Sequence, residues 1–208
     1  LTYKNANAVV GISKILSKDL SKFIKKKVQI IYNPAMDSSI YLKVSNNIKL
    51  PKKVFKKKII LNVGFFENQK DQITILKAFK LLTLEFTNLH LILIGRGSLL
   101  ENLKKFVKSE NLEKNVSFLT SINNPTKYYK IADLFVLSSK YEGFGNVLVE
   151  ALKHNCPVIT SNCKAGPMEI IGNGKFGDYF NVGDYKNLKN KINKFLKNNS
   201  ELKNKTMH

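Results

Sequence analysis

The chain has 208 residues, enough for one full domain or for one domain plus part of another. Its 43% hydrophobic content excludes general disorder, and no apolar run is long enough to cross a bilayer. The formal net charge of +20 comes almost wholly from lysine, because Arg96 is the only arginine. Since base recognition relies on bidentate arginine and on interleaved aromatic residues, we expect no nucleic-acid partner. The lysine runs at 25–27 and 56–58 leave an anionic membrane surface as a candidate partner.

Short apolar runs alternate along the chain with longer segments of helical period. We expect strands at 8–12, 28–32, 59–63, 89–94, 116–119, 134–137 and 158–160. We expect helices at 13–24, 69–84, 99–109, 126–131, 146–153, 167–171 and 185–196. Alternation of strand and helix with near-continuously apolar strands predicts an α/β fold with a doubly wound parallel sheet, covered on both faces.

A polar, lysine-rich stretch near residues 38–57 predicts a domain boundary. The strand–helix–strand unit before it is too small to bury a core alone. We therefore expect residues 1–45 to be the C-terminal remnant of one domain and 46–57 to be a linker. Residues 58–200 then form the main domain, and 201–208 form a tail.

Two cysteines flank a predicted strand and lie too far apart for a disulfide. Cys156 and Cys163 are separated by an extended segment that would hold them about 20 Å apart. No metal-ligand spacing involves them, and the three histidines lie far from one another in sequence. We expect no metal and a reducing, cytoplasmic location, with peripheral contact to the inner membrane face as an option.

The most informative segment lies where the predicted strand 134–137 turns into the predicted helix 146–153. Its sequence from 141 to 152 is YEGFGNVLVEAL. Glycines at such a turn allow a ligand to approach the backbone, and the helix N-terminus offers free N–H groups and a positive dipole end. Glu142 before the helix and Glu150 inside it are carboxylates suited to polyol hydroxyls. The segment predicts a site for phosphate or sugar, and a glycine-capped surface helix is the alternative.

The spacing of these two glutamates, together with ordered matches along the chain, resembles the family 4 retaining glycosyltransferases (glycosyl transferases group 1) of the GT-B fold. The matching segments are AVVGIS at 8–13, IIYNP at 30–34 with Asp37, NVG at 62–64 with QK at 69–70, ILIGRG at 92–97, NVSFL at 115–119, AD at 132–133 with SS at 138–139, PVI at 157–159 and GPMEI at 166–170. The resemblance implies that residues 58–200 are the Rossmann-like, donor-binding C-terminal half of GT-B, and that residues 1–45 belong to the N-terminal, acceptor-side domain.

The resemblance implies a role for each matched residue. Glu142 and Lys70 would be the catalytic pair, with Glu142 at the donor sugar and Lys70 at the diphosphate, where it stabilises the leaving group. Glu150 would hold the ribose, and the backbone near Ile122 would meet the base. The remaining donor contacts would come from backbone at two turns: Gly64, Gly143, Phe144, Gly145, Asn146 and Val147.

By the same resemblance, the activity is transfer of a sugar from a nucleoside-diphosphate sugar, with a preference for UDP, to a glycan or lipid-linked acceptor. The transfer would proceed with retention, without a cofactor, in surface polysaccharide or glycoconjugate biosynthesis. A nucleotide-sugar epimerase of the same fold and a non-catalytic nucleotide-sugar binder stay open as alternatives. With the acceptor side mostly outside this chain, we expect it to be inactive alone.

Three residues depart from the family pattern. Phe65 stands where the family usually has arginine directly after the glycine of the phosphate loop. Arg96 stands where the turn often carries an acid, and Thr120 stands where glycine is common. The first departure removes one of two cations expected at the diphosphate.

Overall fold

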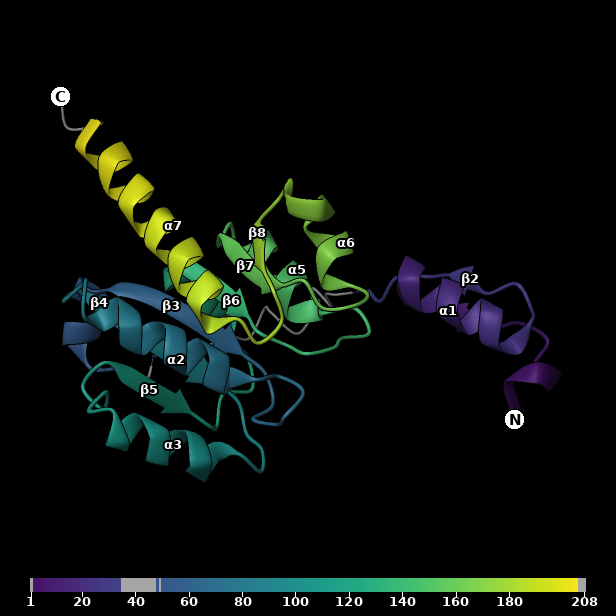
Figure 1. Cartoon of the computed structure of the whole chain (residues 1–208), viewed down its shortest axis with the longest axis horizontal. Coiled ribbons are helices and arrows are strands. Elements are labelled where there is room, and N and C mark those ends of the chain that lie inside the picture. Colours follow the sequence, from purple (N-terminus) through teal and green to yellow (C-terminus); the bar gives the residue numbers. More distant parts are fainter. Residues whose placement is uncertain (1, 35–47, 49, 206–208) are drawn as a thin grey trace.

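The computed structural model describes residues 2–34, 48 and 50–205, and its centre is a six-stranded parallel sheet (Figure 1). The strand order is β5-β4-β3-β6-β7-β8. Five of these strands were predicted; their bounds are Lys58–Val63 for β3, Leu89–Ile94 for β4, Val116–Leu119 for β5, Leu134–Leu137 for β6 and Val158–Ser161 for β7. The order corresponds to the doubly wound Rossmann-like arrangement, which confirms the predicted fold class.

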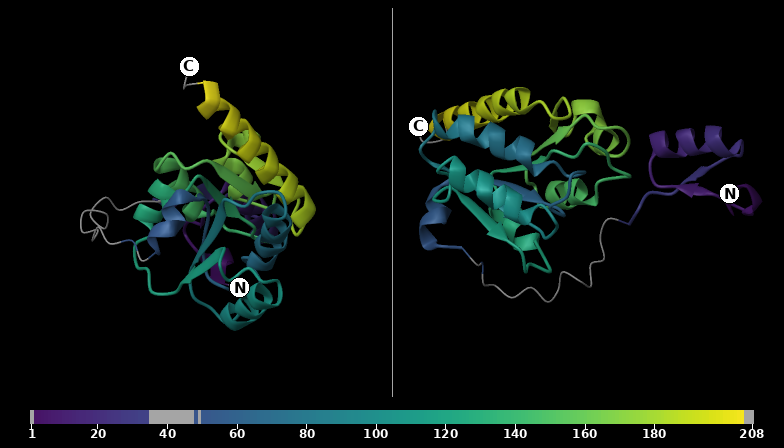
Figure 2. Two further views of the ribbon diagram at one scale, coloured as in Figure 1. Left: turned by 90° about the vertical axis from the view of Figure 1, so that its left-hand side faces the viewer. Right: turned by 60° about the horizontal axis from the view of Figure 1, so that its bottom comes forward.

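Helices cover both faces of this sheet, as the two views of Figure 2 show. On one face lie α2 (Gln72–Thr83), α3 (Leu100–Ser109) and α7 (Tyr185–Lys205). On the other lie α4 (Thr126–Ile131), α5 (Asn146–Lys153) and the region of α6 (Pro167–Ile170), which is followed by a short 3-10 turn, η3 (Gly172–Gly174). Alternate residues of β3 serve the two cores: Ile60 joins the first, and Ile59 and Leu61 join the second.

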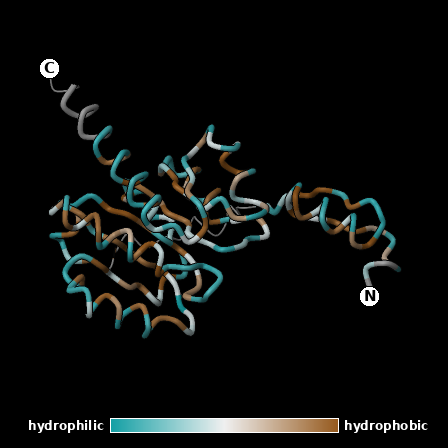
Figure 3. Tube along the Cα trace, viewed as in Figure 1, coloured by the Kyte–Doolittle hydropathy of each residue, from teal (hydrophilic) through white to brown (hydrophobic). Residues whose placement is uncertain are grey.

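A separate strand–helix–strand unit precedes this domain. It consists of η1 (Thr2–Asn5), β1 (Val10–Gly11), α1 (Lys14–Ile24) and β2 (Gln29–Ile30), and β1 pairs with β2 in parallel. The side chain of Ser13 caps α1 by accepting a hydrogen bond from the amide of Leu16 at 3.4 Å. The unit has its own small sheet, and the tube in Figure 3 carries hydrophobic colour along it. Phe23 is 64% exposed, as expected of a unit too small for a core.

Several element bounds differ from the prediction for local reasons. β8 (Asp178–Phe180) was missed because only Phe180 of its three residues is buried. The predicted linker contains a 3-10 helix, η2 (Lys52–Lys56), whose Val54 is buried in the second core. Helix α2 begins three residues later than predicted, after Asp71 adopts a left-handed backbone with φ of 49°. Helix α7 continues past the expected domain edge at residue 200 to Lys205, and residues 35–47 of the boundary region lie outside the described residues.

Both cysteines are buried free thiols, which confirms that they do not pair. Burial, with a smaller contribution from the Asp133 charge, raises the pKa of the Cys156 thiol to about 12. Within the described ranges, no helix is long and apolar enough to span a membrane.

Candidate functional site

The sheet reverses its strand order between β3 and β6, and a cavity of about 460 Å³ opens at the carboxyl ends of the strands nearby. In open parallel sheets this reversal leaves a crevice in which ligands bind. Residues at and after the ends of β3 and β4, residues after β5, and residues of α5 line it: Val63, Gly64, Phe65, Lys70, Ile94, Gly95, Arg96, Thr120, Ile122, Asn123, Pro125, Val147 and Glu150. Of the predicted site residues, Gly64, Lys70, Ile122, Val147 and Glu150 therefore share one cavity.

Glycine is required at two places near the start of α5: in the turn between β6 and α5, and in the neighbouring loop between β7 and α6. Gly145 immediately precedes α5 with φ of 100°, a left-handed conformation that side-chain-bearing residues rarely adopt. At Gly166 a Cβ atom would lie 1.9 Å from the backbone oxygen of Phe144. The two loops can approach this closely only without a side chain at position 166.

The N-terminus of α5 presents backbone donors beside the cavity. Gly145 supplies no side-chain cap, and the first backbone bond of the helix runs from the Leu148 amide to the Gly145 carbonyl at 2.9 Å. Among the described residues, the amides of Asn146 and Val147 have no backbone acceptor. Val147 lines the cavity. Free N–H groups and the positive end of the helix dipole together favour an anion at this point.

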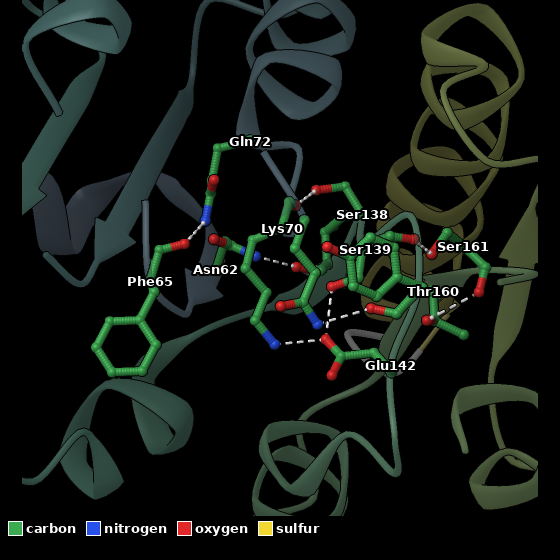
Figure 4. A network of polar contacts seen from close by, with 12 residues as sticks. Asn62, Phe65, Lys70, Gln72, Ser138, Ser139, Glu142, Thr160 and Ser161 are labelled. Carbon is green, nitrogen blue, oxygen red and sulfur yellow. Dashed lines mark hydrogen bonds and ion pairs between the residues drawn. The ribbon is translucent and has the colours of Figure 1, made fainter. Parts of the chain in front are cut away.

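Lys70 and Glu142 form an ion pair, although 72 positions separate them in sequence (Figure 4). The Lys70 Nζ lies 2.5 Å from the Glu142 Oε1, and the Ser139 hydroxyl donates to the same oxygen at 2.6 Å. Only 17% of the Lys70 side chain and 7% of the Glu142 side chain are exposed. The Ser138 hydroxyl donates to the Lys70 carbonyl at 2.7 Å, which ties the loop after β3 to the end of β6. The predicted catalytic pair is thus in direct contact, and its charges compensate each other.

Glu150 lines the cavity from the second turn of α5. Its Oε2 accepts a hydrogen bond from the Tyr129 hydroxyl at 2.9 Å. Burial raises the pKa of the Glu150 carboxyl above its usual 4.5, and the Tyr129 bond opposes the shift in part. The side chain is therefore a half-buried carboxylate at the wall of the cavity, a suitable acceptor for hydroxyl groups.

Gly143 and Phe144 lie on the side of the turn that faces the N-terminal unit. The rings of Tyr32 and Phe144 lie 5.5 Å apart between centroids. A Cβ atom at Gly143 would lie 3.0 Å from the Ile12 Cδ1. These two predicted donor residues are therefore contact points between the unit and the loop, and they do not line the cavity.

Glu169 joins the N-terminal unit to α6, a contact that the sequence analysis did not predict. Its Oε2 accepts a hydrogen bond from the backbone amide of Lys14 at 2.9 Å, at the start of α1. Its Oε1 accepts one from the Tyr32 hydroxyl. The Glu169 bond raises the pKa of the Tyr32 hydroxyl above its usual value. A carboxylate at the positive end of α1 also interacts favourably with the helix dipole.

Sequence reasoning gave no role to several residues that line the cavity. Phe65 and Thr120 appeared only as departures from a family pattern, Arg96 appeared as a departure within a matched segment, and Asn123 and Pro125 did not appear at all. Their position in the sequence could have identified them, because each of these residues lies in a loop that follows a predicted strand.

A protein-family model described as glycosyl transferases group 1 matches residues 45–207. An uncharacterized glycosyltransferase of Methanocaldococcus jannaschii is 36% identical over 174 residues, which cover 81% of this chain and 43% of that protein. An N-acetylgalactosamine-N,N'-diacetylbacillosaminyl-diphospho-undecaprenol 4-alpha-N-acetylgalactosaminyltransferase of Campylobacter jejuni is 34% identical over 180 residues, covering 85% of this chain and 47% of its own length.

Solved structures agree on the fold. HepE of Anabaena, in complex with UDP and glucose, superposes with a TM-score of 0.78 at 22% identity, covering 94% of this chain and 55% of that one. A mutant of TarM from S. aureus, in a complex that includes UDP, gives 0.77 at 23% identity, covering 93% of this chain and 37% of that one. The chain spans less than half the length of the two curated relatives above. By its sequence and its fold, this chain belongs to the glycosyl transferases group 1 family.

Proposed function

We propose that this chain carries the donor site of a retaining glycosyltransferase that takes a nucleoside-diphosphate sugar. The observation that carries the proposal is one cavity, at the carboxyl ends of the strands, lined by Lys70, Val147 and Glu150. A cation, a helix N-terminus and a carboxylate are the groups that a diphosphate and a ribose require.

The order of these groups suggests how a donor would lie. The diphosphate would meet the start of α5 and Lys70, with the donor sugar at Glu142. The ribose hydroxyls would meet Glu150, and the base would lie toward Ile122 on the loop after β5. Departure of the nucleoside diphosphate would then leave its negative charge between Lys70 and the α5 amides.

The comparisons favour UDP and a lipid-linked or glycan acceptor. The HepE and TarM complexes both contain UDP. The name of the Campylobacter relative specifies a diphospho-undecaprenol-linked acceptor. A staphylococcal relative, 33% identical over 162 residues, is named for capsular polysaccharide biosynthesis. We place this protein in surface polysaccharide or glycoconjugate biosynthesis on that basis.

The deciding experiment combines donor binding with product analysis. Calorimetry with UDP, GDP and ADP tests the site, and the longer protein is then assayed with a radiolabelled nucleotide sugar and a membrane extract as acceptor. A transferred sugar with the donor's anomeric configuration supports the proposal, and inversion contradicts retention. Conversion of the donor sugar without transfer would identify an epimerase, and binding without turnover would identify a non-catalytic binder.

Two further parts of the proposal have simple tests. We propose that transfer needs no metal, so activity should survive EDTA. We also propose contact with an anionic membrane through the exposed lysine run at 25–27, which directly follows α1 and its exposed Phe23. Sedimentation with phosphatidylglycerol vesicles should exceed that with phosphatidylcholine vesicles. Equal sedimentation with both would contradict the membrane contact.

A further inference from the structure

The cavity contains two basic side chains, and only one of them is compensated by a carboxylate. Lys70 is paired with Glu142 at 2.5 Å. The other, Arg96, lines the same cavity, is exposed and forms no ion pair among the described residues. A further carboxyl, that of Glu150, also faces the cavity. A diphosphate entering this cavity therefore finds Arg96 as its uncompensated cation.

An acid that contacts the Arg96 turn is already occupied. Glu67 accepts hydrogen bonds from the Ser98 amide at 2.9 Å and from the Ser98 hydroxyl at 2.8 Å. These two bonds lower the pKa of the Glu67 carboxyl, so the group is fully ionised at neutral pH. Glu67 thereby holds the turn after β4 through the amide and the hydroxyl of Ser98. The guanidinium of Arg96, two residues before Ser98, stays available for a ligand.

The fold places Arg96 directly beside the loop that follows β3, residues 64–70. The Phe66 amide donates to the Arg96 carbonyl at 2.9 Å. A Cβ atom at Gly95 would lie 1.9 Å from the Gly64 oxygen, so the two strand-end turns touch through their backbones. The Arg96 side chain therefore starts next to Phe65, on the same cavity wall as the loop that carries Lys70.

From this charge balance and placement, we propose that Arg96 binds the diphosphate of the nucleotide-sugar donor. A guanidinium offers a planar pair of N–H donors that match two phosphate oxygens, and it remains charged at any working pH. Lys70 can then keep its bond to Glu142 while Arg96 shares with it the charge of the ligand. The assignment rests on the proposed function, because it needs a nucleoside diphosphate in this cavity.

The test measures UDP and uridine binding by calorimetry in the full chain and in three variants. Arg96→Ala should weaken UDP binding about ten- to a hundredfold, the usual effect of losing charge-assisted hydrogen bonds, and should change uridine binding less than about twofold. Arg96→Glu should weaken UDP binding further. Lys105→Ala, an exposed charge removal on α3, serves as the matched control and should leave both ligands unaffected.

The possible outcomes distinguish a failure of the Arg96 assignment from a failure of the proposed function. If the wild type binds UDP and Arg96→Glu binds it equally well, the assignment is wrong. If Arg96→Ala weakens uridine as much as UDP, the side chain contacts the base or ribose, and the assignment is again wrong. If the wild type binds no nucleoside diphosphate, the proposed function fails and the role of Arg96 fails with it. Unchanged thermal unfolding of each variant ensures that a loss of binding is local.

Discussion

Replacing Glu150 tests the donor site most directly, because this carboxyl lies at the cavity wall with one defined partner. Glu150→Ala removes the acceptor proposed for the ribose hydroxyls. Losing hydrogen bonds to a charged acceptor costs about 1.5–3 kcal/mol, which is about a ten- to 150-fold loss of affinity. The loss should be similar for UDP, GDP and ADP, because the three share the ribose.

The structure also indicates how this loss depends on pH. Because burial raises the pKa of Glu150, its carboxylate is lost at higher pH than that of an ordinary glutamate. UDP affinity should therefore fall as pH is lowered through that raised pKa. Glu150→Gln, which keeps an oxygen acceptor for the Tyr129 hydroxyl, should bind weakly throughout and lack this dependence.

The same variant should have the opposite effect on folding. A carboxyl whose pKa is higher in the folded state than in the unfolded state destabilises the fold at pH values above the folded-state pKa. The destabilisation is absent at pH values below the unfolded-state pKa. Glu150→Gln should therefore unfold at higher urea concentration at pH 7, with the gain vanishing below about pH 4.5. The control is Glu101→Ala, an exposed acid on α3. Unchanged affinity of Glu150→Ala for all three nucleotides would refute the ribose role.

Four other outcomes are expected. Lys70→Ala should weaken UDP far more than uridine in calorimetry; equal losses would show that the lysine acts on structure through Glu142. Glu169→Ala removes the acceptor for the Lys14 amide and the Tyr32 hydroxyl, an exposed contact that contributes about 1 kcal/mol. Hydrogen exchange should therefore speed up in residues 10–32 while the six-stranded domain is unchanged, and equal exchange would contradict the contact. Burial, with the charges of nearby lysines, lowers the pKa of His90 from 6.5 to about 4. The contribution of neutral His90 to the free energy of unfolding is therefore complete above pH 6.5 and is lost as the pH falls toward 4. Urea denaturation should show up to about 3 kcal/mol of this loss, and His90→Gln should flatten it; a parallel profile in the variant would contradict the reasoning. Finally, we predict that these 208 residues alone bind donor without transferring sugar, because the resemblance to the GT-B fold implies that a cleft between two domains supplies the positioning. Transfer at the rate of the longer protein would overturn that expectation.

Most of the fold could be predicted from local patterns in the sequence. Buried parallel strands are continuously apolar, so a local run such as 89–94 predicted β4 to the residue. The glycine turn and the helical pattern that follows it predicted α5 and its uncapped N-terminus, again from neighbouring residues alone. β8 was not predicted, because a strand with one buried residue in three has no periodic hydropathy pattern. That Glu150 faces the cavity also agrees with its expected place on the helix after the glycine turn.

Which side chains meet depends on the arrangement of the strands in three dimensions and could not be predicted from local patterns. The strand order brings the loop after β3 beside the end of β6, so Lys70 contacts Glu142 across 72 positions. The same order sets Arg96 against the loop after β3, although its sequence context suggested no ligand. Glu169 reaches α1 across 155 positions. Hydropathy patterns report burial of one residue at a time, whereas a charged contact depends on how distant loops are brought together by the sheet.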